Sequence, residues 1–243
     1  PMADTLERAQ EMVAAAQAAG RLYAVIQNRR YDAAARRLRR LVASGALGRL
    51  TTLASDFFLG AHFGGFRTQM RHVLLLDMAI HTFDMARLLS GADPVAVSCK
   101  AWNPAGSWFA HGASAVATFE LSDGVIYSYR GSWCAEGLPT SWESDWRILG
   151  SSGSARWDGG DGFAAEAVAA PGGFISTTAA VALPPLAPDD RVGGHGGLIA
   201  EFVECVRTGR QPETSCGDNI KSLAMVFGAV RSADEGRTVA IDW

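Results

Sequence analysis

The segment from residue 94 to about residue 180 constrains the fold of this chain most, because its apolar and polar residues alternate with a period of two. The alternation is clearest in PVAVSCKAW, in ASAVATFELSDGVIYSYRGSW and in SWESDWRILGSSGSARWDG. Successive side chains of a β-strand point to opposite faces, so this pattern predicts strands with one buried face. The turn sequences SDG (122–124) and SSGS (151–154) separate such runs and predict hairpins. Consecutive hairpins form an antiparallel sheet.

The rest of the chain is mainly helical in its pattern. The expected helices cover residues 4–19, 31–44, 73–90, 198–208 and 218–234, and most of them end at a glycine. Three further strands are expected in RLYAVIQN (21–28), in RLTTLASDFFLG (49–60) and in RTVAI (237–241). The first of these three has the apolar centre of a buried strand.

The order of these elements predicts an α+β fold. It combines a large, predominantly antiparallel open sheet with helices on one face, from residues 31–44, 73–90, 198–208 and 218–234. Residues 1–30 do not belong to the meander, and we interpret them as the last αβ unit of a larger domain. Because proline is tolerated in the first turn of a helix, a chain that starts at Pro1 suggests a cut end. We therefore divide the chain into residues 1–30 and 31–243.

Composition excludes several classes of function. The net charge of −3 argues against a nucleic-acid partner, and no apolar run reaches the length of a membrane span. No secretory signal is visible at the start. The four cysteines are far apart and form no C-x-x-C pair, so we expect reduced thiols, no metal site and a cytoplasmic location.

One helix carries charge where apolar residues prevail. LLLDMAIHTFDMARLLSG (74–91) is apolar almost all round, which predicts burial, yet it contains Asp77, His81 and Asp84. Residues separated by four and by three positions lie on one face of a helix. Burying charged groups is unfavourable unless they are paired or used. The stripe is therefore either a satisfied core network or an active site.

The same helix carries a family resemblance. DMAIHTFD resembles the D-x-x-x-H-x-x-D helix of the Gfo/Idh/MocA oxidoreductases, the relatives of glucose–fructose oxidoreductase and inositol dehydrogenase. The run VIQNRRYDAAARRLRRLVASGALGRL resembles their passage from the nucleotide-binding domain into the second domain. The tail FVECVRTGRQPETSCGDNIKSLAMVFGAVRSADEGRTVAI is similar to their closing helices and last strand. The resemblance covers essentially the whole chain.

The resemblance implies that residues 1–30 are the last helix and strand of a Rossmann domain. The family's G-x-G-x-x-G turn has no counterpart here, because GAHFGG, GGDGF and GGHGG do not follow a strand and open a helix at that spacing; we expect all three to be loops. Pro1 matches the proline of the family's Glu-Lys-Pro turn, which supplies a catalytic lysine. We therefore expect residues 1–243 alone to be inactive and the lysine to precede Pro1.

The resemblance also implies a mechanism. NAD or NADP exchanges a hydride with a carbon that bears a hydroxyl, usually on a sugar or polyol, and the protein must remove the hydroxyl proton. His81 matches the catalytic histidine, and Asp77 matches the acid that holds the substrate hydroxyl. Asp84 is expected to be structural, bonded to backbone or to Arg87. Two acids that flank a histidine, within a chain-long match, favour the active site over the core network.

Further residues fall where family members approach their ligands. Asn28 and Arg29 are expected beside the cofactor, and Arg30, His62 and His72 beside the substrate. For Asn28, Arg29 and Arg30, a solvated or capping cluster is an equally good interpretation. His62 and His72 flank FGGFRTQM, a loop that enters the site in relatives, although a role outside the site is the more frequent one for such histidines.

The sequence thus favours the catalytic and substrate-binding half of an NAD(P)-dependent oxidoreductase that acts on a small sugar- or polyol-like alcohol. The alternative is a non-catalytic ligand-binding or oligomerisation module of the same fold. We also expect a homodimer or higher homo-oligomer through the open face of the sheet, because the strands carry many aromatic residues. These residues are Trp102, Phe119, Tyr127, Tyr129, Trp133, Trp142 and Trp146.

Overall fold

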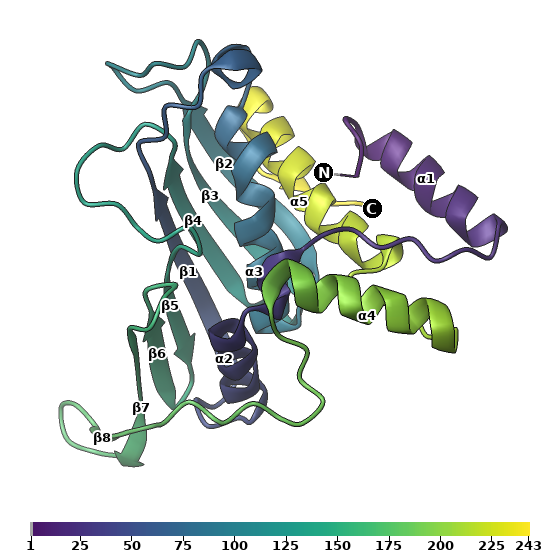
Figure 1. Cartoon of the computed structure of the whole chain (residues 1–243). Coiled ribbons are helices and arrows are strands. Elements are labelled where there is room, and N and C mark those ends of the chain that lie inside the picture. Colours follow the sequence, from purple (N-terminus) through teal and green to yellow (C-terminus); the bar gives the residue numbers. More distant parts are fainter. Residues whose placement is uncertain (1) are drawn as a thin grey trace.

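The fold is built on one nine-stranded sheet. The computed structural model describes residues 2–243, and its strands follow the order β8-β7-β6-β5-β1-β4-β3-β2-β9 (Figure 1). β1 and β4 pair in parallel, and the other neighbouring strands pair antiparallel. The strands are β1 (Leu50–Phe58), β2 (Pro94–Trp102), β3 (Ser114–Leu121), β4 (Ile126–Ser132), β5 (Asp145–Gly150), β6 (Gly153–Trp157), β7 (Phe163–Ala170), β8 (Thr177–Ala180) and β9 (Val239–Ala240).

Five α-helices accompany the sheet. They are α1 (Leu6–Ala18), α2 (Ala33–Ala43), α3 (Ile80–Ser90), α4 (Gly194–Thr208) and α5 (Cys216–Glu235). Four short elements complete the chain, namely η1 (Asn28–Tyr31), η2 (Gly65–Gln69), the π-helix η3 (Leu74–Ala79) and η4 (Ser122–Gly124). The predicted α+β fold with a large, mostly antiparallel open sheet is confirmed, as are the hairpins at 122–124 and 151–154.

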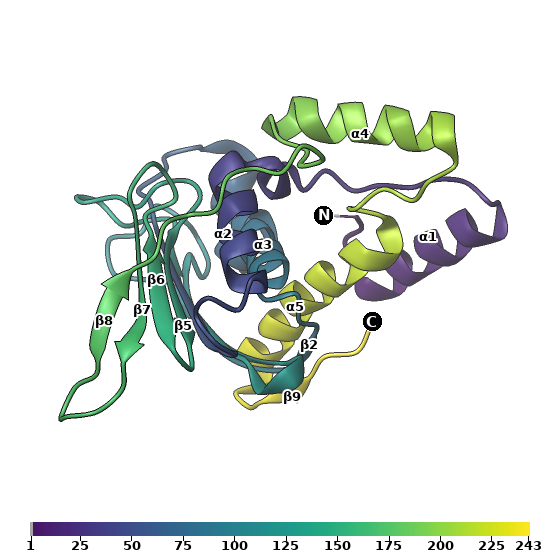
Figure 2. The ribbon, with the colours of Figure 1, turned by 90° about the horizontal axis from the view of Figure 1, so that it is seen from below.

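The core lies between the sheet and the helices α2, α3 and α5, around which the sheet curves (Figure 2). Aromatic side chains from neighbouring strands line its inner face. The rings of Phe119 and Tyr127 stack with centroids 5.6 Å apart, and Phe83 of α3 meets Tyr129 edge to face at 5.1 Å. Such pairs stabilise the packing beyond the area that they bury. They fix α3 against the middle of the sheet.

Alternation predicts that some of the aromatic residues of the strands point inward and that the rest form the subunit interface, but most of them lie in this core. Trp133 and Trp146 are each 2% exposed. Trp133 packs against Phe57, Phe63 and Trp142, and Trp146 stacks on Tyr127. Alternation shows that a strand has two faces but does not tell which face the helices cover. The expectation that Trp133 and Trp146 would reach the open face was therefore wrong.

The strand expected in residues 21–28 does not form. Within the described residues, this segment makes an isolated bridge between Ala24 and Ser215, with Val25 N–H donating to the Thr214 carbonyl. A strand is stable only beside other strands, and the nine-stranded sheet lies elsewhere. Ile26, expected in a buried strand, is half exposed. Helix α1, which precedes this segment, packs against α5 (Figure 1).

Helix α4 also departs from expectation. It packs mainly against η1 and projects past the sheet instead of covering it (Figures 1 and 2). The glycine cluster GGHGG, expected to be a loop, forms its first turn. Glu201, on the buried side of α4, accepts hydrogen bonds from the Tyr31 hydroxyl and from Arg210, so polar contacts fix the helix to η1.

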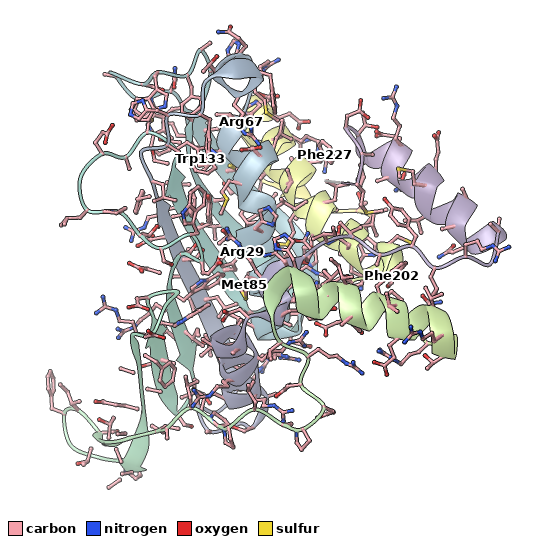
Figure 3. All side chains as sticks on the ribbon, viewed as in Figure 1. Arg29, Arg67, Met85, Trp133, Phe202 and Phe227 are labelled. Carbon is pink, nitrogen blue, oxygen red and sulfur yellow. The ribbon has the colours of Figure 1, made fainter. Side chains whose placement is uncertain are left out.

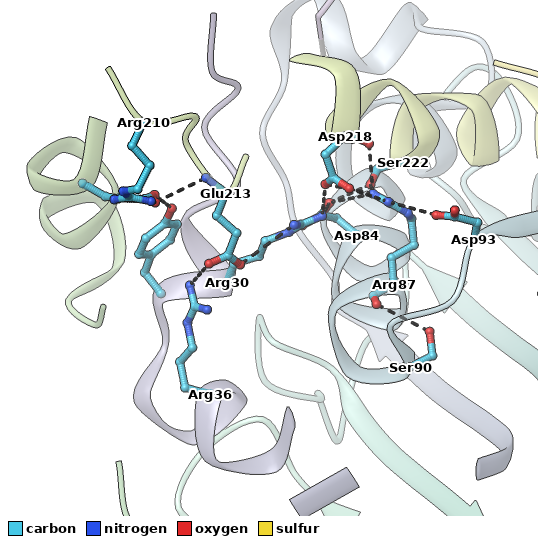
Figure 4. A network of polar contacts seen from close by, with 12 residues as sticks. Arg30, Arg36, Asp84, Arg87, Ser90, Asp93, Arg210, Glu213, Asp218 and Ser222 are labelled. Carbon is cyan, nitrogen blue, oxygen red and sulfur yellow. Dashed lines mark hydrogen bonds and ion pairs between the residues drawn. The ribbon is translucent and has the colours of Figure 1, made fainter. Parts of the chain in front are cut away.

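A buried polar network joins η1, α3 and α5 (Figure 4). Arg30 donates two hydrogen bonds to Asp84, from Nε at 2.7 Å and from Nη2 at 2.6 Å. The Ser222 hydroxyl donates to the same carboxylate at 2.6 Å. Arg87 then connects Ser222 to Asp218, which lies 2.9 Å from Arg30 Nη2. Asp84 is thus structural as expected, but its main partner is Arg30, with Arg87 4.0 Å away.

The network predicts a large effect of Asp84→Ala on stability. Arg30 is 5% exposed, so the variant leaves a buried guanidinium without its main partner. We expect a loss of about 3–5 kcal/mol in the free energy of unfolding, measured by urea denaturation. Asp4→Ala is the matched control, because it breaks an exposed pair with Arg8 and should leave the unfolding midpoint nearly unchanged. Equal midpoints for the two variants would contradict the prediction.

Candidate active site

The candidate site lies on the helix that runs from η3 into α3. The first six residues, Leu74–Ala79, form a π-helix, and the α-helix continues to Ser90 and ends at Gly91, whose φ of 70° suits a glycine cap. π-helical turns are rare and occur often at functional sites. Here the wide turn contains Asp77, and His81 follows in the first turn of α3.

The three residues of the stripe have different surroundings. Asp84 is 2% exposed and belongs to the core network. Asp77, one turn before His81, accepts a hydrogen bond of 2.9 Å from Arg67 Nε and keeps contact with the surface. The core network that the sequence allowed is therefore present at Asp84, whereas Asp77 lies outside this network and nearer the surface.

His81 is held in its neutral form. Burial lowers its pKa to about 4, and the positive charge of Arg29 acts in the same direction. The carboxylates of Asp84 and Asp77 oppose this shift. The buried Nδ1 atom of the ring has no hydrogen-bond partner among residues 2–243. A buried polar atom without a partner is unfavourable, and one that persists needs an explanation.

Arg29, whose positive charge lowers the pKa of His81, pairs with a carboxylate. Its Nε atom is 2.8 Å from a Glu143 oxygen, and its Nη2 donates weakly to the Met78 sulfur at 3.7 Å. Burial lowers the pKa of Arg29, against the opposing effect of Glu143. Figure 3 shows Arg29 beside α3, with Arg67 near the loops that follow the strands. The Arg29–Glu143 pair thus places a compensated positive charge next to the imidazole.

Two other predicted site residues, Asn28 and Arg30, have different surroundings from each other. Asn28 begins η1 and is half-buried, close in sequence to Arg29. Arg30 is occupied by Asp84, Asp218 and the core network.

The two loop histidines make their contacts away from Asp77. His62 is exposed, stacks on Trp108 at 3.7 Å and bonds Glu136 at 2.8 Å. His72, whose φ is 49°, contacts Asp234 of α5 at 2.9 Å. The polar contacts that the structure gives to these histidines do not involve His81.

The sequence did not predict two residues that contact the candidate site, Arg67 and Glu143. Arg67 lies in the FGGFRTQM loop, and that position was a signal that could have identified it. Glu143 lies 114 positions after Arg29 in a loop with no local pattern that identifies it. Ser144, which follows it, is buried with a φ of 71° and contacts Thr82 of α3. These contacts bring the 133–144 loop onto α3 beside His81.

Comparison with known proteins identifies the family. Residues 35–156 match the model of the GFO/IDH/MocA C-terminal domain, so the chain belongs to this family. This range begins within α2, contains the helix with Asp77 and His81 and the strands β1 to β5, and ends within β6.

Individual relatives match nearly the whole chain. It is 30% identical over 256 residues to D-apiose dehydrogenase of Paraburkholderia graminis, covering 99% of this chain and 65% of that protein. It is 26% identical over 250 residues to 1,5-anhydro-D-fructose reductase of Ensifer adhaerens, covering 100% and 71%. An oxidoreductase of Agrobacterium radiobacter, solved with NAD+, L-tartaric acid and magnesium, superposes with a TM-score of 0.81 at 22% identity, covering 99% and 71%. At that identity the superposition shows the fold alone.

The lowered pKa of His81 predicts how stability depends on pH. Between about pH 6.5 and pH 4 the unfolded chain binds a proton on this imidazole that the folded protein does not. Stability should therefore fall as the pH falls through this window, by up to about 1.4 kcal/mol per pH unit from this group. His81→Gln should flatten the dependence in urea titrations, whereas His195→Gln, which removes an exposed histidine, should not. Identical slopes for wild type and His81→Gln would contradict the assignment.

Proposed function

We propose that this chain forms the catalytic and substrate-binding part of an NAD(P)-dependent oxidoreductase that acts on a sugar- or polyol-like alcohol. The observation that carries the proposal is the imidazole of His81. It is neutral at pH 7; its Nδ1 is buried, so a substrate would meet the ring at Nε2, which makes no hydrogen bond among the described residues. Such a ring can accept a proton from a substrate hydroxyl.

Each residue of the cluster has one task in this proposal. Asp77 accepts a hydrogen bond from the substrate hydroxyl and orients it toward the imidazole one turn further along. His81 accepts the hydroxyl proton as the carbon becomes a carbonyl carbon. The imidazolium that forms is stabilised by the carboxylates of Asp77 and Asp84, both of which favour its charged form. In the direction of reduction, His81 returns the proton to the carbonyl oxygen.

In this proposal, the residues at the start of η1 lie beside the cofactor. When bound, a nicotinamide cofactor supplies the acceptor for the hydride of the alcohol carbon. We assign Asn28 and Arg29 to its neighbourhood, as the family resemblance suggests. The Arg29–Glu143 pair has no net charge, so it can stand beside the positively charged ring of the oxidised cofactor without repulsion. Arg30 then acts as a positioning residue through Asp84, and His62 and His72 remain proposed contacts of a substrate that reaches the loops.

The relatives support this proposal. One is a D-apiose dehydrogenase, another a 1,5-anhydro-D-fructose reductase, and a third was solved with NAD+. We keep the division into residues 1–30, as the end of a nucleotide-binding domain, and residues 31–243, as the substrate domain. We also keep a cytoplasmic location, because the four cysteines are far apart in the sequence and form no C-x-x-C pair.

Among the described residues, none of the helices combines the length and apolar character that crossing a membrane requires.

His81→Ala and Asp77→Ala test the reaction directly. In the protein expressed from its complete gene, each should lower kcat by about 10² to 10⁴ while changing cofactor binding little, because each removes a group that handles the reacting proton. Turnover with NAD+ and NADP+ is followed at 340 nm over a panel of sugars and polyols. His195→Ala and Asp4→Ala, both exposed, are the controls. Near wild-type turnover in either site variant would favour the non-catalytic module.

We further propose that two copies pair through the open face of the sheet. With Trp133 and Trp146 in the core, this face instead carries Val116 (40% exposed) and Ile126 (38% exposed) on adjacent strands. The salt bridge between Asp56 and Arg130 lies on the same face. Apolar residues surrounded by polar ones are typical of an interface. Pairing about a two-fold axis would bury this patch on both copies at once.

Charged substitutions on the open face test the dimer. Val116→Glu and Ile126→Glu should shift the molar mass toward that of the monomer in light scattering at low micromolar concentration, because each would bury an unpaired carboxylate. Leu138→Glu, at a fully exposed loop position, is the control. A wild-type monomer at these concentrations, or a dimer that both variants preserve, would exclude this interface.

A further inference from the structure

Arg67 is placed directly over the candidate site. It lies in η2, and its Nε donates to Asp77 at 2.9 Å. The loop around it is fixed by backbone contacts, since Ala110 N–H donates to the Thr68 carbonyl and the Thr68 hydroxyl donates to the Gly65 carbonyl. Figure 3 shows Arg67 at the end of the sheet where the loops gather. Its position therefore does not depend on Asp77 alone.

Within residues 2–243, the guanidinium of Arg67 uses only one of its donor groups. Arg30 and Arg130 each give two hydrogen bonds to a single carboxylate, through Nε and Nη2. Arg67 gives one through Nε, and its two Nη groups have no hydrogen-bond partner among residues 2–243. Its side chain is 35% exposed, so these donors can be reached from solvent.

Aromatic rings limit how a ligand can approach this guanidinium. Its central carbon lies 5.2 Å from the ring centroid of Phe63 and 4.8 Å from that of Phe66, over both ring faces. Such stacking holds an arginine in place and leaves the edge of the guanidinium plane free. The edge with two N–H groups matches the two oxygens of a carboxylate.

We propose that Arg67 binds a carboxylate of the substrate, so that the enzyme acts on sugar acids such as aldonates and uronates in preference to neutral sugars. This inference rests on the proposed function. Arg67 contacts Asp77, and His81 follows Asp77 by one helical turn, about 5 Å along the axis. A polyol chain of a few carbon atoms spans such a distance. It can give a hydroxyl to His81 and Asp77 and a carboxylate to Arg67.

The charge balance of the site permits an anionic substrate. Arg67 compensates Asp77, and Arg29 compensates Glu143, so the two pairs sum to zero around a neutral His81. An oxidised nicotinamide would add one positive charge. A substrate carboxylate would restore neutrality.

The first experiment measures substrate preference. kcat/KM is determined for matched acids and neutral compounds, gluconate with sorbitol and glucuronate with glucose, in the protein expressed from its complete gene. Wild type should prefer the acid. Arg67→Gln should reduce the acid-to-neutral ratio about 10- to 100-fold, mainly through KM, because a hydrogen bond to a charged group is lost. The ratio cancels any general effect on Asp77, and Arg67→Lys should restore part of it through its charge.

Arg71→Gln is the matched control. Arg71 lies nearby, is 71% exposed and pairs with Asp234 at 3.5 Å, so its removal should leave the ratio unchanged. An equal fall in this variant would show a general charge effect and would overturn the assignment to Arg67. Circular dichroism spectra establish that each variant is folded.

The second experiment separates the two proposals. Binding of gluconate and of sorbitol is titrated by tryptophan fluorescence, without turnover. One outcome is that the protein binds gluconate, that Arg67→Gln weakens this binding, and that the protein oxidises no substrate. This outcome would support the carboxylate site and refute the proposed reaction. Oxidation of neutral polyols with an acid-to-neutral ratio that Arg67→Gln does not change would refute the carboxylate site and leave the reaction standing.

Discussion

The ion pair between Arg30 and Asp84 is the interaction on which the rest of the structure depends. Burial alone would lower the pKa of Arg30, but the carboxylates of Asp84 and Asp218 raise it above its ordinary value. Because these groups come from η1, α3 and α5, the network fixes three elements that are far apart in the sequence. A buried pair of this kind contributes little net stability and is costly to break, so its main effect is on geometry. It sets the rotation of α3 and thereby the direction of His81.

The helix with the stripe holds, within eight residues, a buried carboxylate of the core network and a carboxylate near the surface. Asp84 faces the core network, whereas Asp77, seven positions earlier, reaches a surface loop through Arg67. The π-helical turn at 74–79 holds Asp77 and joins the loop with Arg67 to α3, which holds His81 and Asp84. The aromatic contact between Phe83 and Tyr129 holds α3 on the sheet. A hydrophobic helix can therefore carry four ionisable residues, Asp77, His81, Asp84 and Arg87, without leaving a buried charge unpaired.

The sequence predicted the elements of this fold better than their contacts. Alternation from residue 94 to about residue 180 predicted the antiparallel sheet, and the spacing of Asp77, His81 and Asp84 predicted a shared stripe. Local patterns could not tell which face of β4 and β5 the helices cover, so Trp146 was placed on the wrong one. They also could not show that Glu143 reaches Arg29, or that residues 21–28 lack neighbouring strands. These features depend on contacts between distant segments, which no local period encodes.

The electrostatics of His81 set a limit on its chemistry. A pKa near 4 keeps the ring neutral and ready to accept a proton, but it also makes the ring a weak base at pH 7. The carboxylates of Asp84 and Asp77 oppose the lowering of the His81 pKa, but they are not held in place equally firmly. Two hydrogen bonds from Arg30 hold Asp84 in place, whereas Asp77 is held by a single bond from a half-exposed arginine. Within the described residues, Asp77 is thus held by fewer hydrogen bonds than Asp84. In the proposed reaction, a carboxylate that bound Arg67 would offset part of its positive charge, so Asp77 would act more strongly on the imidazole and raise its base strength.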